Sequence, residues 1–268
     1  FLLQPSATFC NLAVTFVVIH VHSKPYSTPP PHLIPMAETV ALVSGANKGI
    51  GKEVARRLVE EKMRVFVGAR DAAQGEAAAK EVGGTFVQLD VSDNASVEGA
   101  IAAIEAQCGR LDVVVNNAGV LGNGANVLTA DLDDARTVID VNVFGAVRVL
   151  RAAERLLRAS PAARVVNVSS ELGSVAHNAD PSFEFAAMKP FAYNTSKAAL
   201  NMTTVLASHA LPGVKVNAAC PGYTDTDLNE HSGHRTVQQA ANVIVRLATL
   251  PDDGPSGRFF NDEGPLPW

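Results

Sequence analysis

The chain contains few of the residues that build disulfide frameworks, metal sites and nucleic-acid-binding surfaces. Its 268 residues include only three cysteines, at positions 10, 108 and 220, and no CxxC pair. We therefore expect no disulfides and interpret the thiols as buried residues in a reducing compartment. The seven histidines are scattered, and His231 and His234 stand without a further ligand cluster, so no metal site is predicted. The formal net charge of −5 makes a nucleic-acid partner unexpected.

The N-terminal region lacks a hydrophobic run long enough to cross a membrane. The apolar stretch Leu12–Val21 covers about ten residues, whereas a spanning helix needs about 20. No basic segment precedes it, so a secretory signal is weakly supported. Residues 25–35 are proline-rich, and Met36 directly precedes the first strand-like run.

This contrast predicts two parts of the chain. Residues 1–35 would be an extension that is disordered, a targeting remnant or an artefact, and residues 36–268 the folded domain. We expect a cytoplasmic protein and no membrane partner for the folded domain. Organellar targeting or anchoring by residues 1–22 is left open as an alternative.

Within the predicted domain, apolar runs of strand length alternate with helical patterns. Apolar residues make up 47% of the chain and charged residues 18%, enough for a sizeable core. The alternation, with continuous rather than alternating apolar runs, predicts an α/β fold: a single doubly wound Rossmann-type domain whose parallel sheet carries helices on both faces. The predicted strands are Val40–Val43, Arg64–Val67, Thr85–Leu89, Asp112–Val115, Arg164–Val168, Lys215–Ala218 and Gly257–Phe260, and the predicted helices Gly49–Glu61, Gln74–Val82, Ser92–Gln107, one or two within Asp131–Leu157, Phe191–Ala210 and Thr236–Leu247.

A glycine-rich loop lies between the first strand and the first helix. Glycines let backbone N–H groups approach a pyrophosphate, and the helix start adds partial positive charge there. We therefore predict a dinucleotide site, against the alternative of a tight turn without ligand. Its candidate residues are Gly45, Asn47, Lys48, Gly49, Ile50 and Gly51.

Basic residues indicate which dinucleotide is bound. An NAD-specific fold places an acidic residue at the end of the second strand, but Ala69 stands there and Arg70 follows. Arg70 and Lys48 suit a 2′-phosphate, so NADP(H) is the predicted cofactor. Asp71 is the main alternative, because a shifted strand end would bring it to the ribose.

Two further strand ends are expected at the same edge of the sheet. Asp90 and Val91 end the third strand. The Asp90 carboxylate could accept a hydrogen bond from the adenine amino group, or it could cap the next helix. Asn117, Ala118 and Gly119 follow the fourth strand, and their small size would let the backbone lie against the cofactor.

The catalytic candidates follow the fourth and fifth strands. Tyr193 and Lys197 are four residues apart on one helix face, and a nearby cation favours the phenolate form. Ser170 ends the fifth strand, and we chose it over Ser169 to hold a substrate oxygen, because Ser169 is expected to point into the fold. Asn142 is unusual within a helix, which indicates a side chain that holds a relay water, a local helix distortion or a buried packing amide.

These residues together resemble the classical short-chain dehydrogenases/reductases, and within them the carbonyl-reductase-like group. The matching pieces, in the family's order, are Gly45-x-x-x-Gly49-x-Gly51, Asn116-Asn117-Ala118-Gly119, Asn142, Ser170, Tyr193-x-x-x-Lys197 and Pro221-Gly222. The resemblance implies that Tyr193 is the general acid/base and that Lys197 holds the nicotinamide ribose and lowers the tyrosine pKa. It also implies that Asn142 holds a water and that Pro221, Gly222, Thr224 and Thr226 wrap the nicotinamide.

The chain departs from the family's pattern at a few positions. Ser44 stands where Thr is more usual, Tyr193 follows Ser170 by 23 positions, and the segment between Thr226 and Thr236 is short. The spacing leaves a monomer or a homodimer open, and the short segment suggests an open site.

We therefore predict an NADPH-dependent reductase/dehydrogenase that interconverts a carbonyl and an alcohol. The substrate would be a small apolar ketone, aldehyde or quinone, or the matching alcohol, against a wall formed by residues 171–188 with Tyr223 and Leu228. The alternative from another class is an NADP(H)-binding redox sensor without turnover. An epimerase or dehydratase would need a longer substrate domain, which the sequence does not show.

Overall fold

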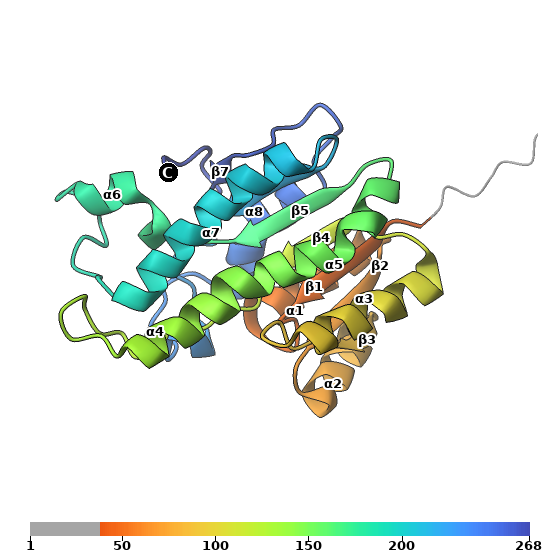
Figure 1. The fold of residues 1–268 in the computed structure, drawn as a ribbon, viewed down its shortest axis with the longest axis horizontal. Coiled ribbons are helices and arrows are strands. Elements are labelled where there is room, and N and C mark those ends of the chain that lie inside the picture. Colours follow the sequence, from red (N-terminus) through yellow and green to blue (C-terminus); the bar gives the residue numbers. More distant parts are fainter. Residues whose placement is uncertain (1–37) are drawn as a thin grey trace, which may run out of the picture. The chain divides into compact units, whose positions relative to one another are not determined.

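The computed structural model describes residues 38–268. The extension predicted over residues 1–35 lies outside the described residues. Figure 1 shows the described part as strands and helices that alternate along the chain.

A seven-stranded parallel sheet forms the centre of the domain, in the order β3-β2-β1-β4-β5-β6-β7. The chain starts in the middle with β1, winds outward to β3, then returns and winds to the other edge (Figure 1), as the predicted doubly wound fold requires. The strands are β1 Val40–Ser44, β2 Arg64–Ala69, β3 Thr85–Gln88, β4 Val113–Asn116, β5 Arg164–Val168, β6 Lys215–Ala219 and β7 Phe259–Phe260.

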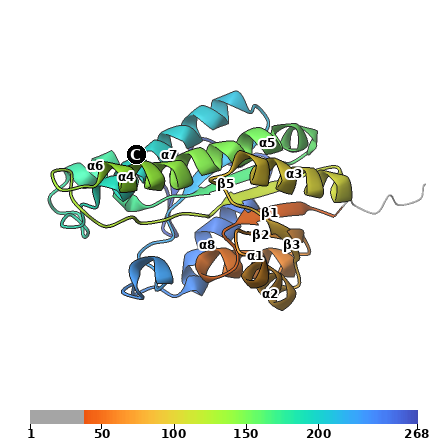
Figure 2. The same ribbon diagram turned by 60° about the horizontal axis from the view of Figure 1, so that its bottom comes forward.

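Helices cover both faces of the sheet (Figure 2). One buried cluster contains side chains of α1 (Gly49–Glu60), α2 (Ala72–Val82) and α8 (Val237–Ala248), and the other contains side chains of α3 (Asn94–Cys108), α5 (Gly145–Ala159) and α7 (Phe191–Ala210). Successive residues of one strand, such as Val40 and Ala41, belong to different clusters. This two-sided burial explains the continuous apolar runs in the sequence.

The largest difference from the predicted elements lies within residues 131–157. That stretch holds α4 (Leu132–Ile139), a π-helical turn at Asp140–Phe144 and then α5. Asn142 lies in the π turn, so the helix distortion weighed from the sequence is present. β2 also runs two residues further than predicted, and residues 171–179 form a 3-10 turn (Glu171–Gly173) and the short α6 (Val175–Ala179).

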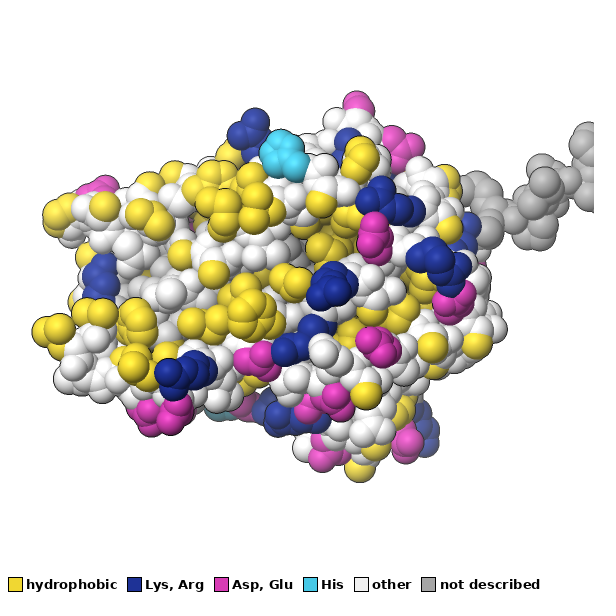
Figure 3. All heavy atoms as spheres, viewed as in Figure 1, with side chains coloured by type: hydrophobic (Ala, Val, Ile, Leu, Met, Phe, Trp, Pro, Cys, Tyr) yellow, Lys and Arg dark blue, Asp and Glu magenta, His cyan; other side chains and the backbone are white. Residues whose placement is uncertain are grey.

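Apolar side chains gather on the face that α5 and α7 present in Figure 3. Met202 and Leu206 of α7 are 59% and 61% exposed, and Phe144 before α5 is 53% exposed. Exposed apolar patches of this kind are typical of contact surfaces. The choice between monomer and homodimer stays a prediction. Among residues 38–268, no helix combines the length and apolar character that crossing a membrane requires.

Candidate active site

A groove of about 1130 Å³ lies along the carboxyl ends of the strands. It brings together segments from β1, β2, β3, β4 and α7 and the loop after β6. Sixteen residues proposed from the sequence line it: Gly45, Asn47, Lys48, Gly49, Ile50, Gly51, Arg70, Asp90, Val91, Asn117, Ala118, Gly119, Tyr193, Lys197, Pro221 and Thr226. Four others, Asn142, Ser170, Gly222 and Thr224, are not part of this lining.

The glycine loop is held against the end of β4 by reciprocal hydrogen bonds. Ser44 Oγ accepts from the backbone N–H of Asn117 at 3.0 Å and of Ala118 at 3.1 Å. The Asn117 side-chain amide donates to the carbonyls of Ser44 and Gly45, both at 3.0 Å. A serine hydroxyl is therefore sufficient at the position where the family more often has threonine.

Glycine is required in this loop by close packing as well as by backbone conformation. Gly45 has a φ of +62°, and a Cβ there would lie 2.9 Å from the Ala118 Cα. A Cβ on Gly51 would lie 2.4 Å from Asn117 Nδ2. The first turn of α1 has no side-chain cap, so its N–H groups are left for another acceptor.

The end of β2 presents both Arg70 and Asp71 to the groove. Asp71 Oδ1 accepts from the backbone N–H of Gln74 at 2.9 Å and so caps α2. The exposed Arg70 lines the groove. One oxygen of the Asp71 carboxylate is thus engaged at the helix start, and the alternative that Asp71 meets the ribose stays open.

The end of β3 places Asp90 and Val91 in the groove with different surroundings. Asp90 Oδ1 accepts from the backbone N–H of Ser92 at 3.0 Å and from its hydroxyl at 2.6 Å. The N-cap of α3 is Asp93, not Asp90. Val91 is 6% exposed and packs against Gly145, where a Cβ would lie 2.8 Å from Val91 Cγ2.

Tyr193 and Lys197 lie on the face of α7 that borders the groove. Lys197 Nζ stands 5.4 Å from the centre of the Tyr193 ring and donates to the Val168 carbonyl at 2.8 Å. Burial lowers the pKa of the Lys197 ammonium to about 8.

Burial also raises the pKa of the Tyr193 phenol, and the neighbouring Cys220 thiol adds to this, while a hydrogen bond with Ser170 opposes it. Lys197 is not among the groups that shift the Tyr193 pKa, so the lowering expected from it is not found in the chain by itself. Cys220 was not singled out from the sequence as a neighbour of this pair, since nothing local to it indicates the contact.

The two serines after β5 point in different directions. Ser169 borders the groove, but it is 2% exposed and its hydroxyl donates to Asn201 Oδ1 at 2.6 Å, inside the fold. The Ser170 hydroxyl accepts from the Leu172 N–H at 3.2 Å and lowers the pKa of the Tyr193 phenol. Ser170 is thus the serine that lies beside the phenol.

Asn142 joins the π turn to the loop after β4 and to α7. Its Oδ1 accepts from Val120 N at 2.8 Å, and its Nδ2 donates to the Val120 carbonyl at 2.9 Å and to Ser196 Oγ at 3.0 Å. Both amide protons are used by the protein, as in a buried packing amide. The side chain nevertheless borders the site, because a Cβ on Gly119 would lie 3.2 Å from Asn142 Oδ1 and 3.6 Å from Lys197 Nζ.

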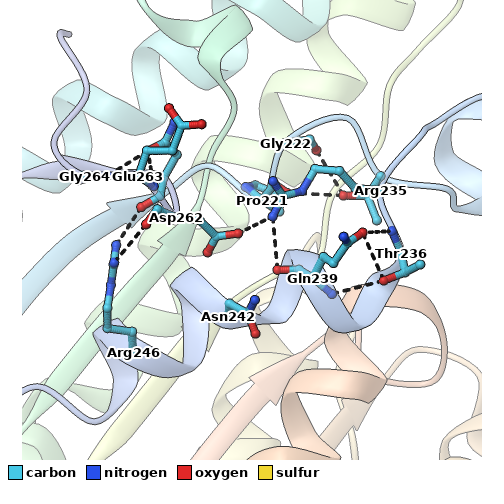
Figure 4. Close-up of polar contacts among 12 residues, drawn as sticks. Pro221, Gly222, Arg235, Thr236, Gln239, Asn242, Arg246, Asp262, Glu263 and Gly264 are labelled. Atoms are coloured by element: carbon cyan, nitrogen blue, oxygen red, sulfur yellow. Dashed lines mark hydrogen bonds and ion pairs between the residues drawn. The ribbon is translucent and has the colours of Figure 1, made fainter.

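The Pro221–Gly222 loop is supported from behind by Arg235 (Figure 4). A Cβ on Gly222 would lie 2.5 Å from Arg235 Cδ, and the φ of +75° at this residue favours glycine. The Arg235 guanidinium donates to the Gln239 carbonyl at 3.2 Å and pairs with Asp262. Arg235 was missed from the sequence, because its contacts come from segments on either side of α8.

Thr224 and Thr226, which follow this loop, mainly stabilise its shape. Thr224 is 5% exposed and donates to the Gly222 carbonyl at 3.0 Å. Thr226 forms a capping box with Asn229 at the 3-10 turn Asp227–Asn229, while also lining the groove. Of the four residues expected to wrap the nicotinamide, Pro221 and Thr226 reach the groove.

An aromatic chain connects the proposed substrate wall to this loop. Consecutive ring centres are separated by 4.9 Å for His177–Phe183, 5.6 Å for Phe183–Phe185, 5.9 Å for Phe185–Tyr223 and 6.0 Å for Tyr223–His234. Residues 177–185 and 223–234 therefore form one connected wall.

Comparison with known proteins assigns this arrangement to a family. The sequence profile of the family described as short chain dehydrogenase matches residues 39–236. The chain belongs to the short-chain dehydrogenase/reductase family, and it is an oxidoreductase with a Rossmann-type fold.

Its relatives include several plant enzymes. The chain is 32% identical to (−)-isopiperitenone reductase of Mentha piperita and 33% identical to (+)-neomenthol dehydrogenase of Arabidopsis thaliana; each alignment covers 82% of this chain and 95% of the relative. Among solved structures it is similar to salutaridine reductase of Papaver somniferum, with 28% identity, a TM-score of 0.74, and coverage of 84% of this chain and 100% of that one. It is also similar to an NADPH-bound carbonyl reductase from chicken fatty liver, with 26% identity, a TM-score of 0.76, and coverage of 87% and 100%.

Proposed function

We propose that this chain is an NADP(H)-dependent reductase/dehydrogenase that interconverts a carbonyl compound and its alcohol, with Tyr193 as the general acid/base. The observation that carries the proposal is the position of Tyr193. Its ring centre lies 5.4 Å from the Lys197 ammonium, its side chain borders the groove at the carboxyl edge of the sheet, and the Ser170 hydroxyl lowers the pKa of its phenol.

The residues of the groove fit a dinucleotide phosphate. The uncapped start of α1 and the close-packed glycines suit a pyrophosphate. Lys48 and Arg70, both in the lining, offer two cations for a 2′-phosphate, and the one carboxylate at the end of β2, Asp71, uses an oxygen to cap α2. The NADPH-bound carbonyl reductase among the similar structures supports the same choice.

The cofactor, when bound, supplies or accepts the hydride. In carbonyl reduction, Ser170 would hold the substrate oxygen and Tyr193 would donate the proton to it. The raised pKa keeps Tyr193 protonated at neutral pH, the form that donation needs. Lys197 would stabilise the phenolate that remains, and Asn142 would hold the loop after β4 and α7 in register through Val120 and Ser196.

The substrate proposed for this chain is a small or medium apolar ketone, aldehyde or quinone, or the matching alcohol. Residues 171–188 contain no Lys or Arg that would recognise a phosphate or carboxylate. The aromatic chain from His177 to Tyr223 and the groove residue Leu228 offer apolar surface instead. The named plant relatives are reductases and dehydrogenases of isopiperitenone, neomenthol and salutaridine.

The test is a panel of apolar carbonyl compounds assayed by loss of NADPH absorbance, with NADH in parallel and product identified by mass spectrometry. We expect turnover with NADPH of at least one cyclic or aromatic ketone, and slower turnover with NADH. Tight NADPH binding without turnover on any carbonyl or alcohol would instead indicate the redox-sensor alternative.

A further inference from the structure

An ion pair crosses the groove next to the glycine loop. Lys48 Nζ lies 2.5 Å from Asp227 Oδ2, and both residues line the groove. Lys48 directly precedes α1, whereas Asp227 lies in the segment after β6. The two segments also approach at Gly49, where a Cβ would lie 3.7 Å from Thr226 Cγ2. One of the two cations offered to a 2′-phosphate therefore already has a carboxylate partner.

The Asp227 carboxylate is held in place by its neighbours. Its Oδ1 contacts His231 Nε2 at 2.9 Å, and the other ring nitrogen, Nδ1, contacts Asp225 Oδ1 at 2.6 Å. Glu230 and His231 both adopt left-handed backbone conformations, with φ of 54° and 61°, which is costly for non-glycine residues. The hydrogen bond from Lys48, followed by its charge, keeps the pKa of the Asp227 carboxyl below its usual range.

These three side chains do not form a metal site. Within residues 38–268, no group of His, Cys, Asp and Glu has the arrangement that a metal ion needs. Both imidazole nitrogens are already in contact with carboxylates. The three side chains Asp225, His231 and Asp227 are instead linked to Lys48, through the ion pair with Asp227.

We propose that Asp227 is a specificity-determining residue that competes with the cofactor 2′-phosphate for Lys48 and thereby lowers the preference for NADPH over NADH. This inference rests on the proposed function, which assigns Lys48 to that phosphate. A phosphate that binds Lys48 must share or displace the carboxylate and also meets its negative charge. NADH has no 2′-phosphate and does not compete.

The first test is Asp227→Asn, which keeps the size of the side chain and removes its charge. We expect the Kd for NADPH to fall about two- to fivefold, because exposed ion pairs are weak. The Kd for NADH should stay unchanged. Both are measured by fluorescence titration of the full chain at low salt, where exposed charges are least screened. Unchanged or weaker NADPH binding would overturn the inference, as would an equal gain for NADH.

The matched control is Glu230→Gln. It removes the same charge from the same segment, at an exposed side chain that forms no ion pair in the described part of the chain. An equal gain in NADPH affinity from Glu230→Gln would mean that net charge, not the Lys48 contact, is responsible. In a Lys48→Met background, Asp227→Asn should no longer change the Kd for NADPH, and a persisting effect would contradict the competition.

The same titrations separate this inference from the proposed function. If the wild-type chain binds NADPH no more tightly than NADH, the NADP(H) assignment itself fails. If wild type prefers NADPH and Asp227→Asn leaves that preference unchanged, only the role of Asp227 fails.

Discussion

The proposed cofactor side of the groove and the proposed substrate wall beside it are built in different ways. On the cofactor side, strand ends meet through backbone hydrogen bonds and glycine contacts, as between Ser44, Gly51 and Asn117. On the substrate side, loops meet through aromatic rings, as between Phe185 and Tyr223. Backbone contacts demand particular residues, whereas ring contacts accept many apolar side chains.

This difference suggests that the two sides respond differently to substitution. Changes on the proposed cofactor side should alter NADPH binding whatever the carbonyl substrate, because those residues are assigned to the dinucleotide alone. Changes on the substrate side should alter the choice of carbonyl and leave NADPH binding unchanged. Tyr193 stands where the sides meet, so its loss should stop the chemistry without affecting either binding event.

The largest effect is expected for Tyr193→Phe. Removal of the phenolic proton should lower kcat by about 10²–10⁴-fold, while the Kd for NADPH stays near wild type because the groove is retained. Stopped-flow turnover and NADPH titration on the same preparation measure both. Turnover close to wild type would exclude Tyr193 as the acid.

A smaller effect, confined to the cofactor side, is expected for Arg70→Ala. Loss of a charged hydrogen bond to the 2′-phosphate should raise the Kd for NADPH about ten- to hundredfold and leave the Kd for NADH unchanged. Arg57→Ala is the control, because Arg57 binds Asn242 Oδ1 and lies outside the groove lining. Equal weakening of both cofactors by Arg70→Ala would show that Arg70 does not contact the phosphate.

Packing of the cofactor side is tested by Gly51→Ala. The new Cβ would lie 2.4 Å from Asn117 Nδ2 and 2.6 Å from the Gly45 carbonyl. We expect a loss of about 1–3 kcal/mol in the free energy of unfolding, measured by denaturant titration, together with weaker NADPH binding. Gly99→Ala in α3, where no atom lies within 4 Å of the new Cβ, should instead stabilise by up to about 1 kcal/mol. Equal stability of the two variants would contradict the tight packing.

The pH dependence of reduction tests the site where the two sides meet. Lys197, with a pKa of about 8, carries its charge below that pH and loses it above. A neutral Lys197 no longer stabilises the Tyr193 phenolate, so kcat/KM for carbonyl reduction should fall about tenfold per pH unit above pH 8. A profile recorded at saturating NADPH measures this, and a flat profile between pH 7 and 10 would refute the role of Lys197.

The smallest effect is expected for Phe185→Leu on the substrate side. Aromatic contacts contribute about 0.5–1.5 kcal/mol, so kcat/KM for an apolar ketone should change by less than about tenfold. The Kd for NADPH should not change. If NADPH binding weakens as much as ketone turnover, the aromatic chain belongs to the cofactor side as well.

Much of the fold could be predicted, because two-sided burial of a parallel sheet leaves continuous apolar runs such as residues 40–43 and 164–168. Boundaries were less accurate: β2 ends at Ala69, and α2 begins after Asp71, whose side chain caps it. The helix distortion at Asn142 was only one of three predictions for this residue. The sequence could not decide between them, because Val120 and Ser196, the partners of the Asn142 side chain, are distant in the chain.

The sequence alone determined the features that depend on near neighbours: the glycine turn between strand and helix, the helical spacing of Tyr193 and Lys197, and Arg70 after β2. Tertiary structure decided the features that need distant segments to meet, namely the Lys48–Asp227 pair, the Arg235 support of Gly222 and the raised pKa of Tyr193. The physical reason is that burial and charge at a site depend on every segment around it, and local spacing specifies only one of those segments.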